Sequence, residues 1–189
     1  MKQILSNWTE LKAPQQLSVG DIRRFLCSDK KFNDCSLAEQ LTGLNIHDFE
    51  SKVLRSNISI QHADLHGMNI LLSESNSPIV IDYGDIKSCS SVIDPITLEL
   101  SHYFHPKMCH KIERNLELAS QWFNDDAIFL FNSNPTTALF LRKWSRDNSF
   151  LRSDYIAGVY AYAMRQLTYD DIDKDFAKAL IKAAINEFN

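Results

Sequence analysis

Two stretches decide how this chain is interpreted: HADLHGMNILL at residues 62–72 and IVIDYGD at residues 79–85. The first packs two histidines, an aspartate and an asparagine closely together and then turns apolar. The second ends an apolar, β-branched run on an aspartate, and a glycine and another aspartate follow. Taken alone, the first stretch admits a metal site, a phosphoryl-transfer loop or a polar turn before a strand.

The stretches NILLS and PIVID are short and apolar, and the residues ESNSP between them are typical of a turn. They predict an antiparallel hairpin. A register that aligns Leu72 with Ile79 also places Asn69 opposite Asp82, with Cβ atoms ~5 Å apart. Amide and carboxylate oxygens side by side fit a hard cation such as Mg²⁺ with bound phosphate.

The spacing of the polar residues narrows the choice further. Asp64 precedes Asn69 by five residues, and Asp82 begins a D-Y-G triplet after the second strand. This is the layout of the kinase signature H-R-D-L-x-x-x-N followed by D-F-G. In that mechanism the first aspartate accepts the hydroxyl proton, while the asparagine and the second aspartate hold the metal ions that bridge the nucleotide phosphates.

These motifs resemble the aminoglycoside phosphotransferase and choline-kinase-like families, whose hallmark is H-x-D-L-H-x-x-N followed by I-D-[FWY]-x-D. His66 matches the second histidine, which separates these small-molecule kinases from most protein kinases. DPITLELS, at residues 94–101, resembles their D-P-x-x-D-L-A segment, with Glu99 in place of the second acid. DPITLELSHYFHP and YAMRQLTYDD are also similar to kinase-like domains in bacterial multidomain proteins of the conflict-associated type.

The resemblance implies an enzyme that transfers the γ-phosphate of ATP to a hydroxyl group of a small molecule. Asp64, as the base, and His66 would be its catalytic residues. Asn69 and Asp82 would hold Mg²⁺ and, through it, the nucleotide. Three further residues would support the site. His62 would brace the loop, and Asp85 would shape the site beside His66. Asp94 would cap a helix and tether the loop after Gly84.

The resemblance also implies a fold: α+β, mainly α, the C-terminal lobe of a kinase-like protein, with a helical body and a small central hairpin sheet. One domain would cover residues 1–189, with a helical entry at 1–57, the catalytic loop and hairpin at 58–86, and helices at 87–189. Neither a G-x-G-x-x-G loop nor a V-A-I-K-like strand is present. The nucleotide-binding N-lobe is therefore expected to be absent, and ATP binding to be weak without it.

Local patterns predict further details of the helices. Ser36 and Glu39 have the spacing of a capping box, and Asp94 followed by Pro95 is typical of a helix start. Helical spacing in DYIAGVYAYAM favours core positions, with an acceptor-binding face as the alternative. Arg165 in the same helix would pair with a buried carboxylate such as Glu99. The basic residues of a later helix are expected on its solvated face: Arg142, Lys143 and Arg146.

The composition and charge of the chain limit the classes of partner that are expected. The net charge of −4, from 20 basic and 24 acidic residues, gives no reason to expect a nucleic-acid or membrane partner. The N-terminus has no signal-peptide pattern and apolar runs are short, which predicts a cytoplasmic protein. Four cysteines without C-x-x-C spacing suit buried or idle thiols. A helical lobe without its partner lobe would expose apolar surface, which favours self-association or pairing with a separate N-lobe.

Three other interpretations compete with an active phosphotransferase. A catalytically weak kinase-like module, used for binding or regulation of a protein partner, would also lack the N-lobe. A metal-dependent hydrolase would need His62, Asp64 and His66 on one strand, where alternate side chains face the same way. The segment HYFHPKMCH, at residues 102–110, holds histidines and a cysteine that suit either a zinc site or, more simply, a helix end.

Overall fold

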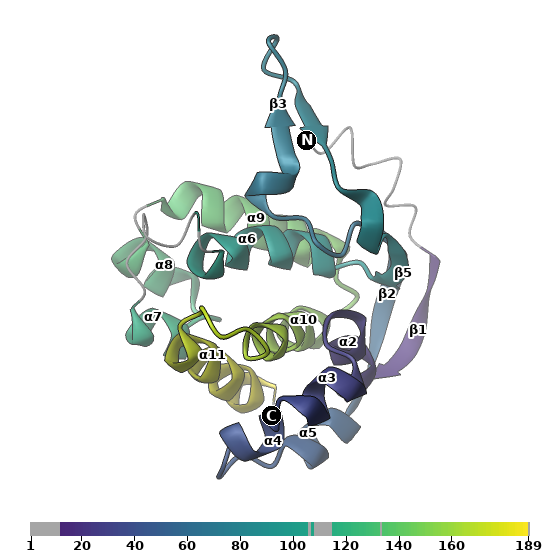
Figure 1. The fold of residues 1–189 in the computed structure, drawn as a ribbon, viewed down its shortest axis with the longest axis vertical. Helices are drawn as coiled ribbons and strands as arrows, with labels where there is room; N and C mark the ends of the chain where they lie inside the picture. Colours follow the sequence, from purple (N-terminus) through teal and green to yellow (C-terminus); the bar gives the residue numbers. More distant parts are fainter. Residues whose placement is uncertain (1–11, 106, 108–114, 133, 189) are drawn as a thin grey trace.

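The computed structural model describes residues 12–105, 107, 115–132 and 134–188. The protein is α+β and mainly helical, with 57% helix and 16% strand, as the sequence predicted. Figure 1 shows a helical body with a sheet along one side and a hairpin that projects from the body. No helix in the described ranges is long and apolar enough to cross a membrane.

A three-stranded antiparallel sheet, in the order β1-β2-β5, borders the helices. Its strands are β1 (Lys12–Ser18), β2 (Val53–Gln61) and β5 (Lys87–Ser90). The prediction of an all-helical entry at residues 1–57 was therefore wrong. The pairing of β1 is irregular between Lys12 and Gln15, around Pro14, which suits an edge strand because proline cannot donate to the ladder.

Short helices fill the span between β1 and β2: α2 (Val19–Leu26), α3 (Asp29–Asp34), α4 (Leu37–Gln40) and α5 (Ile46–Ser51). A capping box starts α2, where the Ser18 hydroxyl accepts from the N–H of Asp21 and the Asp21 carboxylate accepts from the N–H of Ser18. The box predicted at Ser36 is absent: Ser36 has a φ of 48° and its side chain does not cap α4.

The predicted hairpin exists, but its register differs by one residue. β3 (Ile70–Leu72) pairs with β4 (Pro78–Val80), and Leu72 faces Pro78 instead of Ile79. Asn69 therefore lies across from Ile81, whose N–H donates to its carbonyl at 2.9 Å, and not from Asp82. The turn around Asn76, which has a φ of 57°, takes one residue fewer than the prediction allowed.

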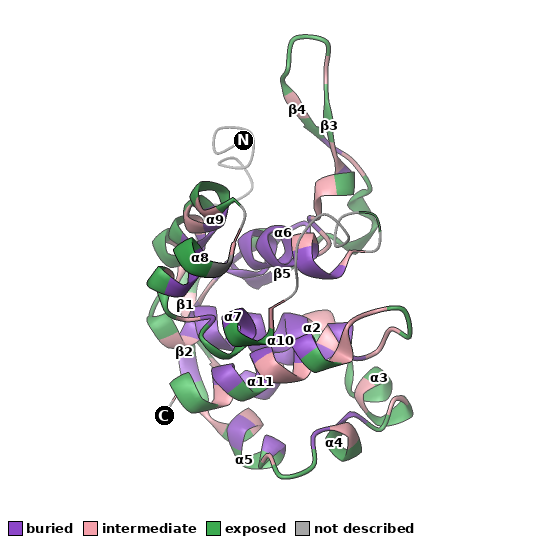
Figure 2. Cartoon of the chain, turned by 90° about the vertical axis from the view of Figure 1, so that its left-hand side faces the viewer, coloured by how far each residue is buried: buried purple, intermediate pink, exposed green. Residues whose placement is uncertain are grey.

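Six helices form the rest of the described chain: α6 (Ile93–Phe104), α7 (Leu116–Ser120), α8 (Asp125–Phe131), α9 (Pro135–Asn148), α10 (Arg152–Gln166) and α11 (Lys174–Glu187). α10 lies between α6 on one side and α2 and α11 on the other, and it is buried almost throughout (Figures 1 and 2). The predicted core positions Tyr155, Val159 and Tyr162 are buried. Gly158 of α10 faces α6, where a Cβ would lie 2.5 Å from the Cδ1 of Ile96.

Charged and polar groups also lie in this core. Arg142 is 1% exposed, and its Nε donates to Glu99 at 2.7 Å between α9 and α6. Arg142 was therefore wrongly placed on a solvated face, although Lys143 beside it is exposed. Cys27 and Cys89 are buried, and burial raises the pKa of the Cys89 thiol to about 12, so this thiol stays protonated at neutral pH.

Candidate active site

A left-handed turn follows β2 and begins the site. Ala63 has a φ of 63°, and the carboxylate of Asp94 holds this turn by accepting from the N–H of His62 and of Ala63, both at 2.8 Å. Asp94 is 4% exposed, and burial raises its pKa to about 6, against the effect of the two donors. The sequence predicted that Asp94 would tether the loop after Gly84, whereas its carboxylate holds the loop after β2.

Asp94 also does not cap a helix. α6 begins at Ile93 with Val92 in the N-cap position, so Asp94 lies inside the first turn. Its own N–H donates to the Oε1 of Gln61 at 3.0 Å, at the end of β2. Asp94 therefore joins the first turn of α6 to the end of β2 both as a donor, through its N–H, and as an acceptor, through its carboxylate. These bonds fix where the polar loop leaves the sheet.

His62 joins the same loop to the segment after the hairpin. Its ring is fully buried, and Nε2 donates to the carbonyl of Ile81 at 2.9 Å. The ring also lies 5.7 Å, centroid to centroid, from that of Tyr83. Because β2 ends at Gln61, His62 and Asp64 do not continue a strand, and the alternating array that a metal hydrolase would need is not formed.

Asp64 lies at a pocket wall and is held by an arginine from the far end of the chain. Its Oδ1 accepts from the Nη2 of Arg165 at 2.8 Å. Arg165 also donates through Nη1 to the carbonyl of Ala63 at 3.3 Å and through Nε to the hydroxyl of Tyr169 at 3.2 Å. The sequence singled out Arg165 but paired it with Glu99, which binds Arg142 instead.

His66 faces the other oxygen of Asp64. Its Nε2 lies 3.6 Å from Oδ2, longer than a hydrogen bond. Its Nδ1 accepts from the N–H of Met68 at 3.2 Å, so a neutral ring carries its proton on Nε2, directed at Asp64. Burial lowers the pKa of His66, which favours this neutral form. The His105 ring lies 4.7 Å away, centroid to centroid.

Asn69 ties the polar loop to the hairpin. Its Nδ2 donates to the carbonyl of Asp64 at 3.0 Å, and its own carbonyl accepts from the N–H of Ile81. Among the described residues, none donates a hydrogen bond to the Oδ1 of Asn69. Asp82 follows Ile81 with a φ of 62° and an exposed carboxylate, and Asp85 is exposed in the short 3₁₀ turn η2 (Tyr83–Asp85).

A pocket of about 270 Å³ opens beside Asp64. Aromatic side chains, polar groups and charged groups all contribute to its wall, and they come from the polar loop, α6, α10 and the segment before α11: Asp64, His66, Thr97, Ser101, Phe104, His105, Tyr162, Arg165, Gln166, Tyr169, Asp171 and Ile172. The Oγ1 of Thr97 is buried and has no hydrogen-bond partner in the described part of the chain. Tyr162 of α10 therefore belongs to the buried core and also contributes to the wall of this pocket.

The zinc alternative for residues 102–110 gains no support from the described part of this segment. His102 donates through Nδ1 to the carbonyl of Leu98 at 2.8 Å, inside α6, and His105 turns to His66. Cys109 and His110 lie outside the described residues. No group of three histidine, cysteine or acidic side chains among the described residues is placed to hold a metal ion.

Comparisons of the chain with protein-family models, with curated proteins and with solved structures gave no match. The site joins a carboxylate at a pocket wall, an arginine that holds it, a neutral imidazole and an amide with an unused oxygen. Sequence reasoning did not find Thr97 or Tyr169, and it considered His105 only for a zinc site or a helix end, because only the approach of α6 and α10 to the loop brings these residues to the pocket.

Proposed function

We propose that this chain is the catalytic lobe of an ATP- and Mg²⁺-dependent phosphotransferase that acts on a hydroxyl group of a small molecule. One observation carries the proposal: Asn69 links the carboxylate-bearing residue Asp64 to the segment that carries Asp82, through hydrogen bonds at 3.0 and 2.9 Å. The base and the two oxygen ligands of the motif thus come from two segments that hydrogen bonds join, beside a pocket that can receive an acceptor.

The proposed chemistry assigns a different task to each oxygen of Asp64. Arg165 holds Oδ1, so Oδ2 remains to accept the proton of the acceptor hydroxyl as that oxygen attacks the γ-phosphate. The neutral His66 lies 3.6 Å from Oδ2, where its Nε2–H can donate to the oxygen of the incoming hydroxyl. Positioning of the acceptor, more than any change in covalent chemistry, then supplies the rate.

The residues present fit a magnesium ion. The orientation of the Asn69 amide, with Nδ2 on the Asp64 carbonyl, leaves Oδ1 as an oxygen ligand. Asp82, whose carboxylate is exposed, follows Ile81, the residue whose N–H donates to the Asn69 carbonyl. Mg²⁺ is usually held by one or two carboxylates together with water and substrate phosphates, so a cage of three acidic side chains is not required. When bound, the ion would neutralise charge on the nucleotide phosphates.

The first test is a titration of the protein with ATP, with and without Mg²⁺, followed by calorimetry. We expect nucleotide binding at millimolar concentrations that depends on Mg²⁺ and is lost in Asp82→Asn. Glu74→Gln, which removes an exposed acid from the tip of the same hairpin, should bind as the unchanged protein does. Absence of Mg²⁺-dependent binding in the natural full-length protein would refute the phosphotransferase assignment.

The second test separates the base from the metal ligands. Asp64→Asn should abolish phosphoryl transfer while leaving the fold and the Mg²⁺-dependent binding of ATP nearly unchanged, because the hydrogen bond from Asn69 goes to the backbone carbonyl of residue 64. Transfer is measured as the release of ADP with a panel of hydroxyl acceptors. Loss of metal-dependent binding in this variant would show that the roles are assigned wrongly.

One observation favours the alternative of a binding or regulatory module. The ion pair between Arg165 and Asp64 neutralises the proposed base, and both partners are mostly buried. A protein that binds ATP with Mg²⁺ but releases no ADP with any acceptor, in the unchanged form as in Asp64→Asn, would support this module.

A further inference from the structure

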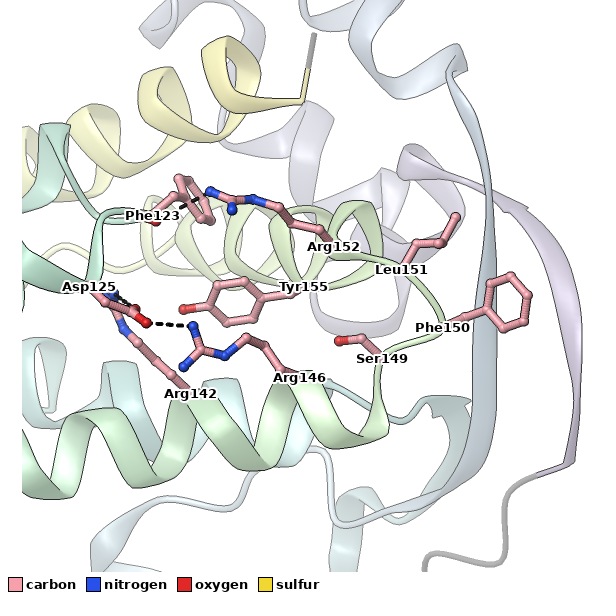
Figure 3. Close-up of a pocket in the computed structure, with 9 residues that line it drawn as sticks. All are labelled: Phe123, Asp125, Arg142, Arg146, Ser149, Phe150, Leu151, Arg152 and Tyr155. Atoms are coloured by element: carbon pink, nitrogen blue, oxygen red, sulfur yellow. Dashed lines mark hydrogen bonds and ion pairs between the residues drawn. The ribbon is translucent and has the colours of Figure 1, made fainter.

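A second pocket, of about 280 Å³, opens where the α7–α8 turn, α9 and the start of α10 meet (Figure 3). It shares no lining residue with the pocket beside Asp64. Its wall combines arginines with aromatic and apolar side chains: Phe123, Asp125, Arg142, Arg146, Ser149, Phe150, Leu151, Arg152 and Tyr155. None of these residues has a role in the proposed phosphotransferase.

Three of the lining residues are arginines, and Asp125 is their acidic counterpart in the wall. The carboxylate of Asp125 accepts from the Nη1 of Arg146 at 2.7 Å and from the Nη1 of Arg142 at 3.4 Å, so it serves both cations at once (Figure 3). The second contact is long for a charged hydrogen bond. Asp125 is thus placed where an anionic group of a ligand would be held.

The other counter-ions leave arginine donors for a ligand. Glu99, in the core, accepts from the Nε of Arg142, but the buried Nη2 of Arg142 has no hydrogen-bond partner in the described ranges. Arg152 donates through Nη2 to the carbonyl of Phe123 at 3.3 Å and pairs with Glu187 at the surface, where the two side chains are 65% and 38% exposed. An exposed pair of this kind contributes little stability, so Arg152 can change partner at low cost.

The remaining wall suits an apolar body. Tyr155 and Phe123 pack edge to face at 5.8 Å, whereas Phe150 and Leu151, in the loop between α9 and α10, point away from the arginines in Figure 3, with the Phe150 ring 4.8 Å from the guanidinium of Arg55. In Figure 3 the rings of Phe123 and Tyr155 lie near Arg152 and Arg146, respectively. A pocket with mostly apolar walls and a few convergent polar groups is the usual form of a small-molecule site.

We propose that this pocket binds a small organic anion, in which a phosphate or carboxylate group meets Arg146 and Arg152 and an aromatic body meets Phe123 and Tyr155. When the ligand is absent, the Asp125 carboxylate accepts hydrogen bonds from Arg146 and Arg142, and it therefore competes with the anionic group of the ligand. The site is separate from the proposed catalytic one: Tyr155 and Arg165 lie ten positions apart on α10, which is about 15 Å along a helix.

The test uses phenyl phosphate and inorganic phosphate as probes, titrated into the intact protein and followed by NMR. We expect phenyl phosphate to bind more tightly than inorganic phosphate, because only the former reaches the apolar wall. Arg146→Gln and Arg152→Gln should each weaken phenyl phosphate binding about tenfold, the effect of a lost charge-assisted hydrogen bond. Lys143→Gln removes an exposed cation from the same helix, outside the pocket wall, and should leave binding unchanged.

Asp125→Asn gives the result that separates this proposal from general attraction of anions. Removing the competing carboxylate should tighten phenyl phosphate binding, whereas a structural role for Asp125 alone predicts weaker binding or none. The proposal is overturned if phenyl phosphate does not bind, if Lys143→Gln weakens binding as much as Arg146→Gln, or if Asp125→Asn weakens it. Equal binding of the two probes would overturn the assignment of an apolar body. Circular dichroism and thermal unfolding of each variant show whether it is folded.

Discussion

Arg165 is the residue on which the geometry of the candidate site depends most. It reaches Asp64, the backbone of Ala63 and the hydroxyl of Tyr169 with different nitrogens of one guanidinium group, and its side chain is 16% exposed. A planar fork of donors fixes the direction of a carboxylate in a way that a lysine ammonium cannot. Arg165 is therefore a positioning residue for Asp64 in the proposed reaction.

Arg165→Gln is expected to lower kcat for phosphoryl transfer by about a hundredfold, because a small misplacement of the base removes much of the benefit of positioning. Arg165→Lys should restore part of this loss, since it keeps the charge but loses the fork. The KM for ATP should change little. Steady-state kinetics of both variants measure the effect, with Lys143→Gln as the control. A loss of ATP binding equal to the loss of kcat would contradict a positioning role.

Asp94 links the stability of the protein to pH. Burial raises its pKa to about 6, so in the folded protein it binds a proton at pH values where the unfolded chain has released it. Its contribution to the free energy of unfolding therefore decreases as pH rises from about 4 to about 7, by up to about 3 kcal/mol. Asp94→Asn removes this titration but leaves one backbone N–H poorly paired, at a cost of about 1–3 kcal/mol.

Urea unfolding of the unchanged protein and of Asp94→Asn, at several pH values, measures this contribution. The unfolding free energy of the unchanged protein minus that of Asp94→Asn should decrease as pH rises through the range below 6. Other buried carboxylates, such as Glu99 and Asp154, titrate in both proteins and cancel in the comparison. A difference that grows with pH would show that the two N–H donors keep Asp94 ionised at a low pKa.

At the scale of elements, the approach of α10 to α6 depends on Gly158. A Cβ at this position would lie 2.5 Å from Ile96 and 2.8 Å from Val92, both in or next to the first turn of α6. That turn also carries Asp94, so the packing of two helices and the position of the loop after β2 are connected. A local change in the contact between the helices is thus expected to reach the candidate site.

Gly158→Ala should destabilise the protein by about 1–3 kcal/mol, because the added methyl group overpacks the contact between α10 and α6. Gly84→Ala is the matched control: its Cβ would meet only the Oδ1 of Asp82, at 3.8 Å. There the substitution should be neutral or slightly stabilising, since it restricts the unfolded chain. Thermal unfolding compares the two variants. Equal stability of the two would mean that α6 moves away without cost.

At the scale of the whole molecule, buried contacts are distributed very unevenly. In the part of the chain that the structure describes, the large core surrounds α10, whereas the hairpin has a small cluster at its base, formed by Leu65 and Val80 with Ile70 and Trp144 packed against them. Leu71, Leu72 and Ile79 remain exposed on the projecting strands (Figure 2). A two-stranded hairpin with little burial is marginally stable by itself.

Hydrogen exchange should follow this distribution. We expect the amides of β3 and β4 to exchange by local opening, well before those of α10, which should require global unfolding. Mass spectrometry after labelling at neutral pH measures the order. Protection of the hairpin equal to that of α10 would show that another surface covers Leu71, Leu72 and Ile79, in keeping with the self-association or lobe pairing expected from the sequence. Dilution of the protein then distinguishes the two sources of protection: protection by a second copy should decrease on dilution, and protection by a covalently connected lobe should not.

The sequence predicted the fold best where one pattern was strong and local. The α+β class, the strand before the polar loop, the hairpin and the core positions of α10 all follow from periodicity and turn residues. It was less successful with β1, whose polar residues give an edge strand no apolar alternation, and with residues 110–132, where the described part holds two short helices instead of one. Helix caps were also misplaced, since φ at Ser36 depends on the fold around it.

By itself, the sequence determined which chemical groups occur together in the polar loop and after the hairpin, because their spacing is a property of the chain. Only the tertiary structure decided their partners. It assigned Arg165 to Asp64 and Arg142 to Glu99, placed Asp94 under the loop, and shifted Asn69 opposite Ile81. The physical reason is that ion pairs between distant residues, and a hairpin register that differs by one residue, are set by how helices and turns pack. A local sequence pattern does not specify that packing.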